Sequence, residues 1–179
     1  MIPLVLTFVG DDRPGLVNAV SDKIAAFGGT WLESRSARLA GKFAGILLVN
    51  VPESKVSELE SALRGLTPAT LHLTLDRGAA EEARASRLIM LDILGNERPG
   101  IVRDVTQALS ALGVNIEEFE SGLESAAFTG VPMFHAHARL SAPEALPVDD
   151  LRKALERLAG EIMVDVTVAE EDRPAEPVR

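Results

Sequence analysis

The sequence predicts an α+β protein made of two β-α-β-β-α-β units, each a four-stranded antiparallel sheet with both helices on one face. An internal repeat is the first observation behind this prediction. Gly-Asp-Asp-Arg-Pro-Gly at residues 10–15 returns as Gly-Asn-Glu-Arg-Pro-Gly at residues 95–100, an offset of 85. The apolar residues that follow recur at the same offset, as in Val17 with Val102 and Val20 with Val105. Strand-like and helix-like apolar spacings also alternate in the same order in both copies.

The first copy opens with the apolar, β-branched run Ile2–Val9, which predicts a central strand. Pro14 suits the first turn of a helix, and the apolar residues after it recur at helical spacing as far as Phe27. Gly28-Gly29 then ends that helix. We expect the remaining elements in this order: strand Thr30–Leu39, a tight turn at residues 40–42, strand Phe43–Val51, helix Ser54–Leu66 and strand Thr70–Leu75.

The second copy is expected to repeat these elements. Its predicted strands are Leu88–Leu94, Val114–Leu123, Met133–Leu140 and Glu161–Val168, its helices are Gly100–Leu112 and Asp149–Leu158, and Ser121–Val131 is expected to form a longer hairpin loop. This element order is the ferredoxin-like arrangement. We therefore expect domains at residues 1–76 and 87–169, a linker at 77–86 and a flexible acidic tail at 170–179.

The composition excludes several classes of protein. The chain contains no cysteine, which rules out a disulfide scaffold, a zinc–thiolate site, an iron–sulfur cluster and a Cys nucleophile. With one Trp and no Tyr, the core must be mostly aliphatic. The longest apolar runs are too short to span a membrane, and the N-terminus lacks the features of a signal peptide. We therefore expect a cytoplasmic location.

The charge argues against contact with nucleic acid. The formal net charge is −9, and the residues after position 85 carry most of it, with nine Lys or Arg against 17 Asp or Glu. Binding to phosphate backbones requires a basic patch, which this chain lacks. We expect no direct nucleic-acid binding and no membrane partner.

The repeated turns hold groups that suit an α-amino acid. A helix that starts after Pro14 or Pro99 leaves N–H groups without intrahelical partners, and these can accept a carboxylate. Gly15 and Gly100 allow a ligand to approach the backbone closely. The neighbouring charged and amide residues can bind an ammonium group or neutralise an acid: Asp11, Asp12, Arg13, Asn96, Glu97 and Arg98. The same residues also make a good turn without any ligand.

The two Arg-Pro-Gly turns, each at the start of a β-α-β-β-α-β copy, resemble those of the ACT domain. Gly28-Gly29-Thr30 and Gly113-Val114-Asn115, which end the first helices, fit the same pattern. Two copies over residues 2–169, with no attached catalytic or DNA-binding domain, resemble the glycine cleavage system transcriptional repressor family. Residues 34–43 are also similar to the second strand and hairpin of that family.

The resemblance implies a regulatory protein that senses an amino acid and needs no cofactor or metal. Its ligand, glycine or another small amino acid, would bind at interfaces between ACT copies, and it would control a partner such as a transcriptional activator by protein–protein contact. By motif position the ligand-binding residues are Asp11, Asp12, Arg13, Pro14, Gly15, Leu16, Thr30, Asn96, Glu97, Arg98, Pro99, Gly100, Ile101 and Asn115. Because Thr30 replaces the amide of Asn115, the two sites are expected to be unequal. A homodimer is also expected, since such sheets leave edges and one face uncovered.

Two alternatives remain open at this stage. One is a ligand-free ACT scaffold that acts only through protein contacts. The other is a small enzyme using His135, His137 or acidic residues such as Glu118, Glu120 and Glu124. The chain lacks the common nucleophile, phosphate-loop and dinucleotide motifs, so we expect no enzymatic activity and no catalytic residues. His135 and His137 share a strand face, but without a third ligand they are expected to face solvent rather than hold a metal.

Overall fold

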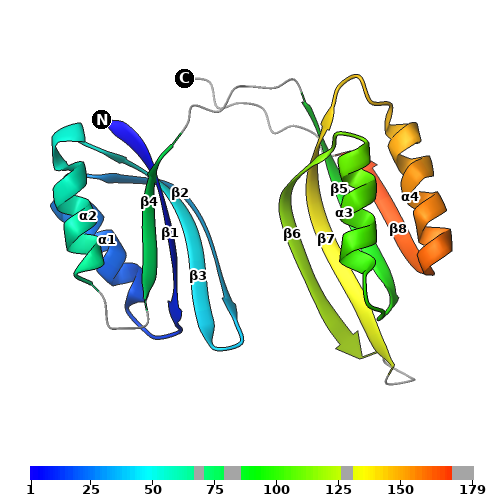
Figure 1. Cartoon of the computed structure of the whole chain (residues 1–179), viewed down its shortest axis with the longest axis horizontal. Coiled ribbons are helices and arrows are strands. Elements are labelled where there is room, and N and C mark those ends of the chain that lie inside the picture. Colours follow the sequence, from blue (N-terminus) through cyan, green and yellow to red (C-terminus); the bar gives the residue numbers. More distant parts are fainter. Residues whose placement is uncertain (67–70, 79–85, 126–130, 171–179) are drawn as a thin grey trace. The chain divides into compact units, whose positions relative to one another are not determined.

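The structure is a computed structural model that describes residues 1–66, 71–78, 86–125 and 131–170 (Figure 1). It divides into two compact units, Met1–Glu82 and Ala83–Arg179. Each unit contains a four-stranded sheet with the same strand order, so the repeat found in the sequence is a repeat of structure. The predicted α+β class, with two ferredoxin-like units, is confirmed.

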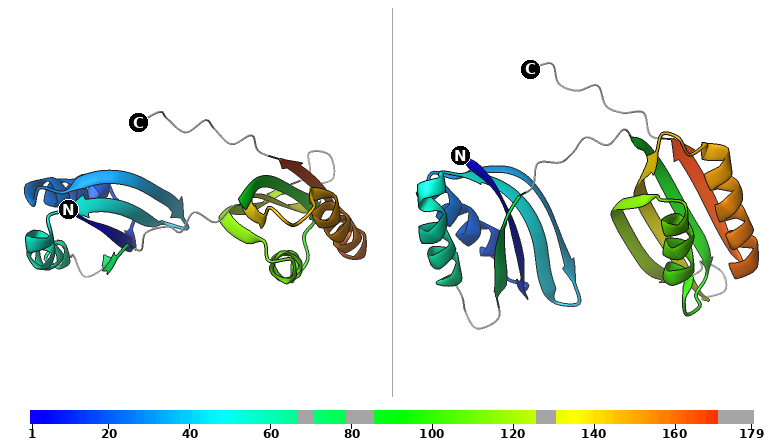
Figure 2. Two further views of the ribbon diagram at one scale, coloured as in Figure 1. Left: turned by 90° about the horizontal axis from the view of Figure 1, so that it is seen from above. Right: turned by 45° about the horizontal axis from the view of Figure 1, so that its top comes forward.

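The first unit follows the expected order of elements. Its strands are β1 (Ile2–Asp11), β2 (Thr30–Leu39), β3 (Lys42–Val51) and β4 (His72–Arg77), and its helices are α1 (Leu16–Ala26) and α2 (Val56–Arg64), the latter after a 3-10 turn at Glu53–Lys55. The strand order β2-β3-β1-β4 makes every neighbouring pair antiparallel. Both helices pack on one face of the sheet (Figure 2). Ala40 and Gly41, both with positive φ, form the predicted tight turn between β2 and β3.

Apolar alternation along the strands explains this packing. Leu4, Leu6 and Phe8 of β1 are buried, whereas Val9 on the same strand is exposed. The buried strand residues meet the helical stripe of α1, whose buried members are Leu16, Val20 and Ile24. A strand period of two and a helix period near four therefore place both apolar sets in one core.

The second unit has the same architecture. Its strands are β5 (Ser86–Asn96), β6 (Asn115–Ser125), β7 (Pro132–Pro143) and β8 (Val164–Glu170), and its helices are α3 (Ile101–Ala111) and α4 (Val148–Ile162). The strand order is β6-β7-β5-β8, again antiparallel throughout. Ile101, Val105 and Leu109 of α3 take the places that Leu16, Val20 and Ile24 hold in α1.

Two predicted boundaries in the second unit are wrong. Glu161 does not begin a strand, because α4 continues to Ile162 and β8 starts at Val164. The apolar spacing of Leu155 and Ala159 extends the helix past its predicted end. The predicted long loop is also shorter than expected, because β6 pairs with β7 as far as Ser125 opposite Pro132.

Several sequence predictions concern segments beyond the described residues. Most of the predicted linker and nearly all of the predicted tail fall there. Among the described residues, none of the helices has the length and apolar character needed to cross a membrane.

Candidate functional site

The first candidate turn joins β1 to α1, and its acids already have basic partners. Asp11 ends β1, and its carboxylate lies 2.5 Å from Nζ of Lys42. The Asp12 carboxylate lies 2.5 Å from Nε of Arg38, while the Asp12 N–H donates to the Gly41 carbonyl at 3.0 Å. Contacts from the β2–β3 hairpin therefore hold this turn in place. All four side chains are at least one third exposed, and ion pairs this exposed contribute little to stability.

Arg13 in the same turn is differently placed. Its side chain has no ion pair or hydrogen bond within the described part of the chain. It lines a hollow of about 140 Å³ together with Pro14, Gly15 and Ala19. Gly15 caps α1 in the left-handed conformation (φ 87°), and no side chain caps the helix. A guanidinium without a partner among the described residues and an uncapped helix start thus share one small hollow, an arrangement that can bind a carboxylate.

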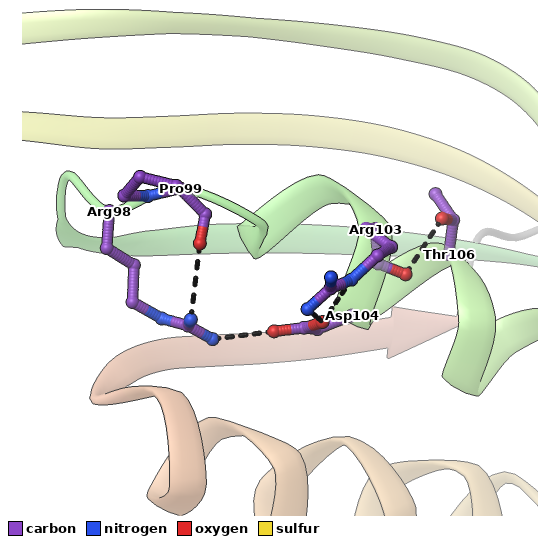
Figure 3. Close-up of polar contacts among 5 residues, drawn as sticks. All are labelled: Arg98, Pro99, Arg103, Asp104 and Thr106. Carbon is purple, nitrogen blue, oxygen red and sulfur yellow. Dashed lines mark hydrogen bonds and ion pairs between the residues drawn. The ribbon is translucent and has the colours of Figure 1, made fainter.

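The second candidate turn joins β5 to α3 and has the same backbone geometry. Gly100 caps α3 with φ 95°, again without a side-chain cap. Its arginine, however, is engaged: Arg98 Nη2 donates to Oδ2 of Asp104 at 2.7 Å, and Arg98 Nη1 donates to the Pro99 carbonyl at 3.4 Å (Figure 3). Arg103 donates to the other Asp104 oxygen from Nε at 2.9 Å and from Nη2 at 2.8 Å. Asp104 therefore holds two guanidinium groups at the start of α3.

The charges around Asp104 affect its ionisation. Hydrogen bonds from Arg103, and next from Arg98, hold the pKa of the Asp104 carboxyl below its usual range. Asp104 is a site residue that the repeated motif alone does not indicate, although comparison of the two helices could have found it. At the offset of 85 residues its counterpart is Ala19, so the first helix lacks the acid that engages Arg98 in the second.

The remaining turn residues divide between backbone and side-chain roles. The Leu16 and Ile101 side chains are buried in their cores, so only their backbone groups remain for a ligand. The Glu97 N–H donates to the Pro132 carbonyl at 3.2 Å, while the side chains of Glu97 and Asn96 form no ion pair or hydrogen bond with other described residues. The second turn therefore offers a carboxylate and an amide, whereas the first offers a guanidinium.

Thr30 and Asn115 do not join these turns within their own units. Thr30 pairs with Asn50 at one end of the first sheet, whereas Asp11 pairs with Lys42 at the other end. Asn50 pairs in turn with Pro3, and eight residue steps along β1 lead from Pro3 to Asp11, which corresponds to roughly 26 Å. Asn115 opens β6 opposite Ser141 in the same way, and its amide donates to Glu117 at 2.9 Å. A ligand at either turn cannot contact the strand-opening residue of the same unit.

The histidine pair lies on the face of the second sheet opposite the helices. His135 and His137 have ring centroids 6.0 Å apart. His137 contacts the Asp92 carboxylate through Nδ1, and His135 Nε2 lies 3.6 Å from the Glu124 carboxylate. Among the described residues, no group of three or more His, Cys, Asp or Glu is arranged to hold a metal ion. Carboxylates, rather than a shared ion, are the neighbours of these imidazoles.

Comparison with known proteins agrees with the fold and the turns. The ACT domain family model matches residues 3–76, which is nearly the whole of the first unit. The second unit repeats its strand order and its Arg-Pro-Gly turn. Residues 3–76 thus match the ACT domain, and the second unit is ACT-like in its strand order and its turn.

More particularly, the chain resembles the glycine cleavage system transcriptional repressor of Escherichia coli (strain K12). The two share 26% identity over 164 residues, which cover 89% of this chain and 85% of the relative. A crystal structure of an unknown protein from Galdieria sulphuraria has a TM-score of 0.87 and 29% identity, over 96% of this chain and 99% of that one. A crystal structure of a provisionally assigned glycine cleavage system transcriptional repressor has a TM-score of 0.73 and 18% identity, over 96% and 98%, which shows a common fold.

Proposed function

We propose that this chain is an amino-acid-sensing regulator that controls a protein partner by direct contact, and that it is not an enzyme. The observation that carries the proposal is the first turn, where Arg13, which has no partner among the described residues, and the uncapped start of α1 share a hollow of about 140 Å³. Such a hollow suits a small ligand with a carboxylate. The resemblance to a glycine cleavage system repressor makes glycine the first amino acid to test.

The turn offers a contact for each end of an amino acid. The ligand carboxylate would accept hydrogen bonds from Arg13 and from the first N–H groups of α1. Its ammonium group would replace Lys42 or Arg38 at Asp11 or Asp12, an exchange that costs little because these ion pairs are exposed. Leu16 and Pro14 would contribute through backbone and shape alone.

We propose that the second turn binds the same ligand more weakly. Asn96 and Glu97 offer contacts for an ammonium group, but Arg98 is held by Asp104, and a ligand carboxylate must compete with that bond. The expected inequality of the two sites then has a cause different from the one that the sequence suggested. It lies in Ala19 and Asp104, rather than in Thr30 and Asn115.

The regulatory mechanism would be a population shift. A ligand changes the activity of the chain only if it binds one conformation or assembly more tightly than another. A partner that prefers the liganded form would then be held or released as the amino acid concentration changes. The partner is proposed to be a transcriptional activator, and the chain is proposed to act as a homodimer without direct contact to DNA.

A thermal-shift screen against the twenty amino acids tests the sensing proposal. Trp31 is the only Trp and there is no Tyr, so its fluorescence reports on the first unit, where it packs against the core. A ligand at 100 times its Kd adds about 2.7 kcal/mol, which raises Tm by several degrees. We expect one small amino acid to do so, and Arg13→Ala to remove the effect.

Failure of all twenty amino acids to change Tm would overturn sensing by the isolated chain. The paired state of Asp11, Asp12 and Arg98 favours one alternative for that case, a ligand-free scaffold. Retained binding to a protein partner without any response to amino acids would select the scaffold.

A further inference from the structure

The second unit contains a hollow that the amino-acid site does not explain. Its volume is about 550 Å³, and it lies where α4 and the start of β8 meet the end of β5. Its lining includes the polar residues Asn96, Glu156 and Asp165 and the apolar residues Leu94, Met133 and Met163. Carboxylates and large apolar side chains thus face the same space.

The charge in this hollow is uncompensated. Neither Glu156 nor Asp165 forms an ion pair or a hydrogen bond with the described residues, and both are exposed. The lining contains no Lys or Arg. By contrast, Glu118 on β6 has a basic neighbour, Arg139, at 3.0 Å. The hollow therefore attracts a cation.

Apolar side chains remain exposed beside these carboxylates. Met163 is 75% exposed and Leu94 is 47% exposed. Met163 also holds a left-handed backbone (φ 54°), which is unfavourable for a residue with a side chain. Methionine adapts its shape to a partner, and exposed apolar groups next to polar ones are typical of interaction sites.

We propose that this hollow binds an Arg or Lys side chain from a basic, amphipathic segment of a protein partner. The cationic head would lie between Glu156 and Asp165, and its hydrocarbon stem and apolar neighbours would pack on Met133, Met163 and Leu94. The acidic second half of the chain would steer such a segment toward it. This inference rests on the proposed function, because it names the surface through which the regulator contacts its partner.

The four methionines give a direct test. Full-length chain labelled with 13C at the Met methyl groups is titrated with a short acetylated peptide of alternating leucine and arginine, and with its leucine–glutamate counterpart. We expect the methyl signals of Met133 and Met163 to shift with the basic peptide only, while Met1 and Met90, which do not line the hollow, stay unchanged. Shifts confined to Met1 or Met90, or no shift at all, would overturn the proposal.

Two variants separate specific docking from general attraction. Glu156→Gln with Asp165→Asn should weaken peptide binding at least tenfold. The matched control, Glu144→Gln with Glu161→Gln, removes the same charge from exposed residues outside the hollow and should change affinity less than twofold. Equal weakening by both pairs would reduce the interaction to net charge and overturn the proposal.

A third variant blocks the space without changing the charge. A Cβ at Gly160 would meet no atom within 4 Å, so Gly160→Leu can extend into the hollow with the fold intact. It should abolish the Met133 and Met163 shifts. Undiminished peptide binding to Gly160→Leu would contradict docking in this hollow.

The same samples distinguish failure of this inference from failure of the proposed function. If an amino acid raises Tm but the basic peptide leaves Met133 and Met163 unchanged, the docking proposal fails and sensing stands. If the peptide binds at the hollow and no amino acid raises Tm, sensing fails and the docking surface stands.

Discussion

The two Arg-Pro-Gly turns share one backbone conformation but differ in the ion pairs of their arginines. Gly15 and Gly100 both hold a left-handed conformation and start helices without a side-chain cap. In the second turn Arg98 is bound to Asp104, whereas in the first turn Arg13 has no partner in the described part of the chain. One helix position, Ala19 or Asp104, accounts for the difference. A repeated motif can therefore keep its shape in both copies while only one copy keeps its charge available.

The largest expected effect tests what the turns share. Valine at position 15 or 100 would have to adopt a left-handed backbone, and each change should destabilise its own unit by about 1–3 kcal/mol. Trp31 fluorescence should show a lower Tm for Gly15→Val and no change for Gly100→Val. The lower stability of the second unit in Gly100→Val should appear in circular dichroism. The control is Gly160→Ala, in a helix with open space around it, which should keep or raise Tm. A lower Tm of the Trp31 transition in both valine variants would show that the two turns do not affect their own units independently.

The next largest effect is expected from a substitution that gives the first turn the acid found in the second. Ala19→Asp places a carboxylate where Asp104 lies in α3, so it should bind Arg13 and compete with the ligand. Affinity for the amino acid found in the screen should fall about tenfold or more, since bonds between charged groups are strong. Calorimetric titration measures this, with Ala19→Asn as the uncharged control. An unchanged affinity in Ala19→Asp would remove Arg13 from the site.

The reciprocal substitution, which removes the acid from the second turn, should strengthen amino-acid binding there. Asp104→Ala frees Arg98 and Arg103, so amino-acid affinity at the second turn should rise severalfold. Titration of the double variant Arg13→Ala with Asp104→Ala isolates the second turn. If this double variant binds no better than Arg13→Ala alone, Asp104 does not limit the second site.

The smallest effect is the pH dependence of the second unit. Arg103 and Arg98 hold the pKa of Asp104 in the folded state below the usual value of 3.8. The Asp104 carboxylate therefore makes its full contribution to stability above that pH. The contribution is lost as pH falls through the lower pKa of the folded state. Urea unfolding followed by circular dichroism should give the wild type a larger free energy of unfolding than Asp104→Asn at pH 7. The two values should converge in acid. A constant gap at every pH would show that the carboxylate charge is not responsible.

Much of the fold was predictable because its signals are local. The apolar spacing from Leu16 to Ile24, the glycines at helix ends and the repeated turns each act within a few residues. The end of α4 was missed because its apolar spacing continues to Ile162, and nothing before Val164 forces a strand. The length of β6 was missed because only pairing with β7 keeps residues 124 and 125 extended.

The candidate site was predictable only in part. Sequence alone placed Arg13, Gly15, Arg98 and Gly100 in equivalent turns, since the repeat aligns them directly. The family resemblance adds Thr30 and Asn115 to the same set, and strand register puts each at the end of its sheet away from the turn of its own unit. Register depends on pairing between distant segments, and therefore a motif cannot reveal it.

What the sequence by itself determined is the repeat, the fold class, the glycine-capped turns and the acidic charge, because each depends on residue type and near spacing. Only the tertiary structure decided which charges are available. Arg98 meets Asp104 across a turn of helix, Asp11 and Asp12 meet Lys42 and Arg38 from the hairpin, and Glu156 meets no cation within the described chain. The reason is physical: a charge is neutralised by what lies within a few ångströms in space, and the folding of the chain sets that distance.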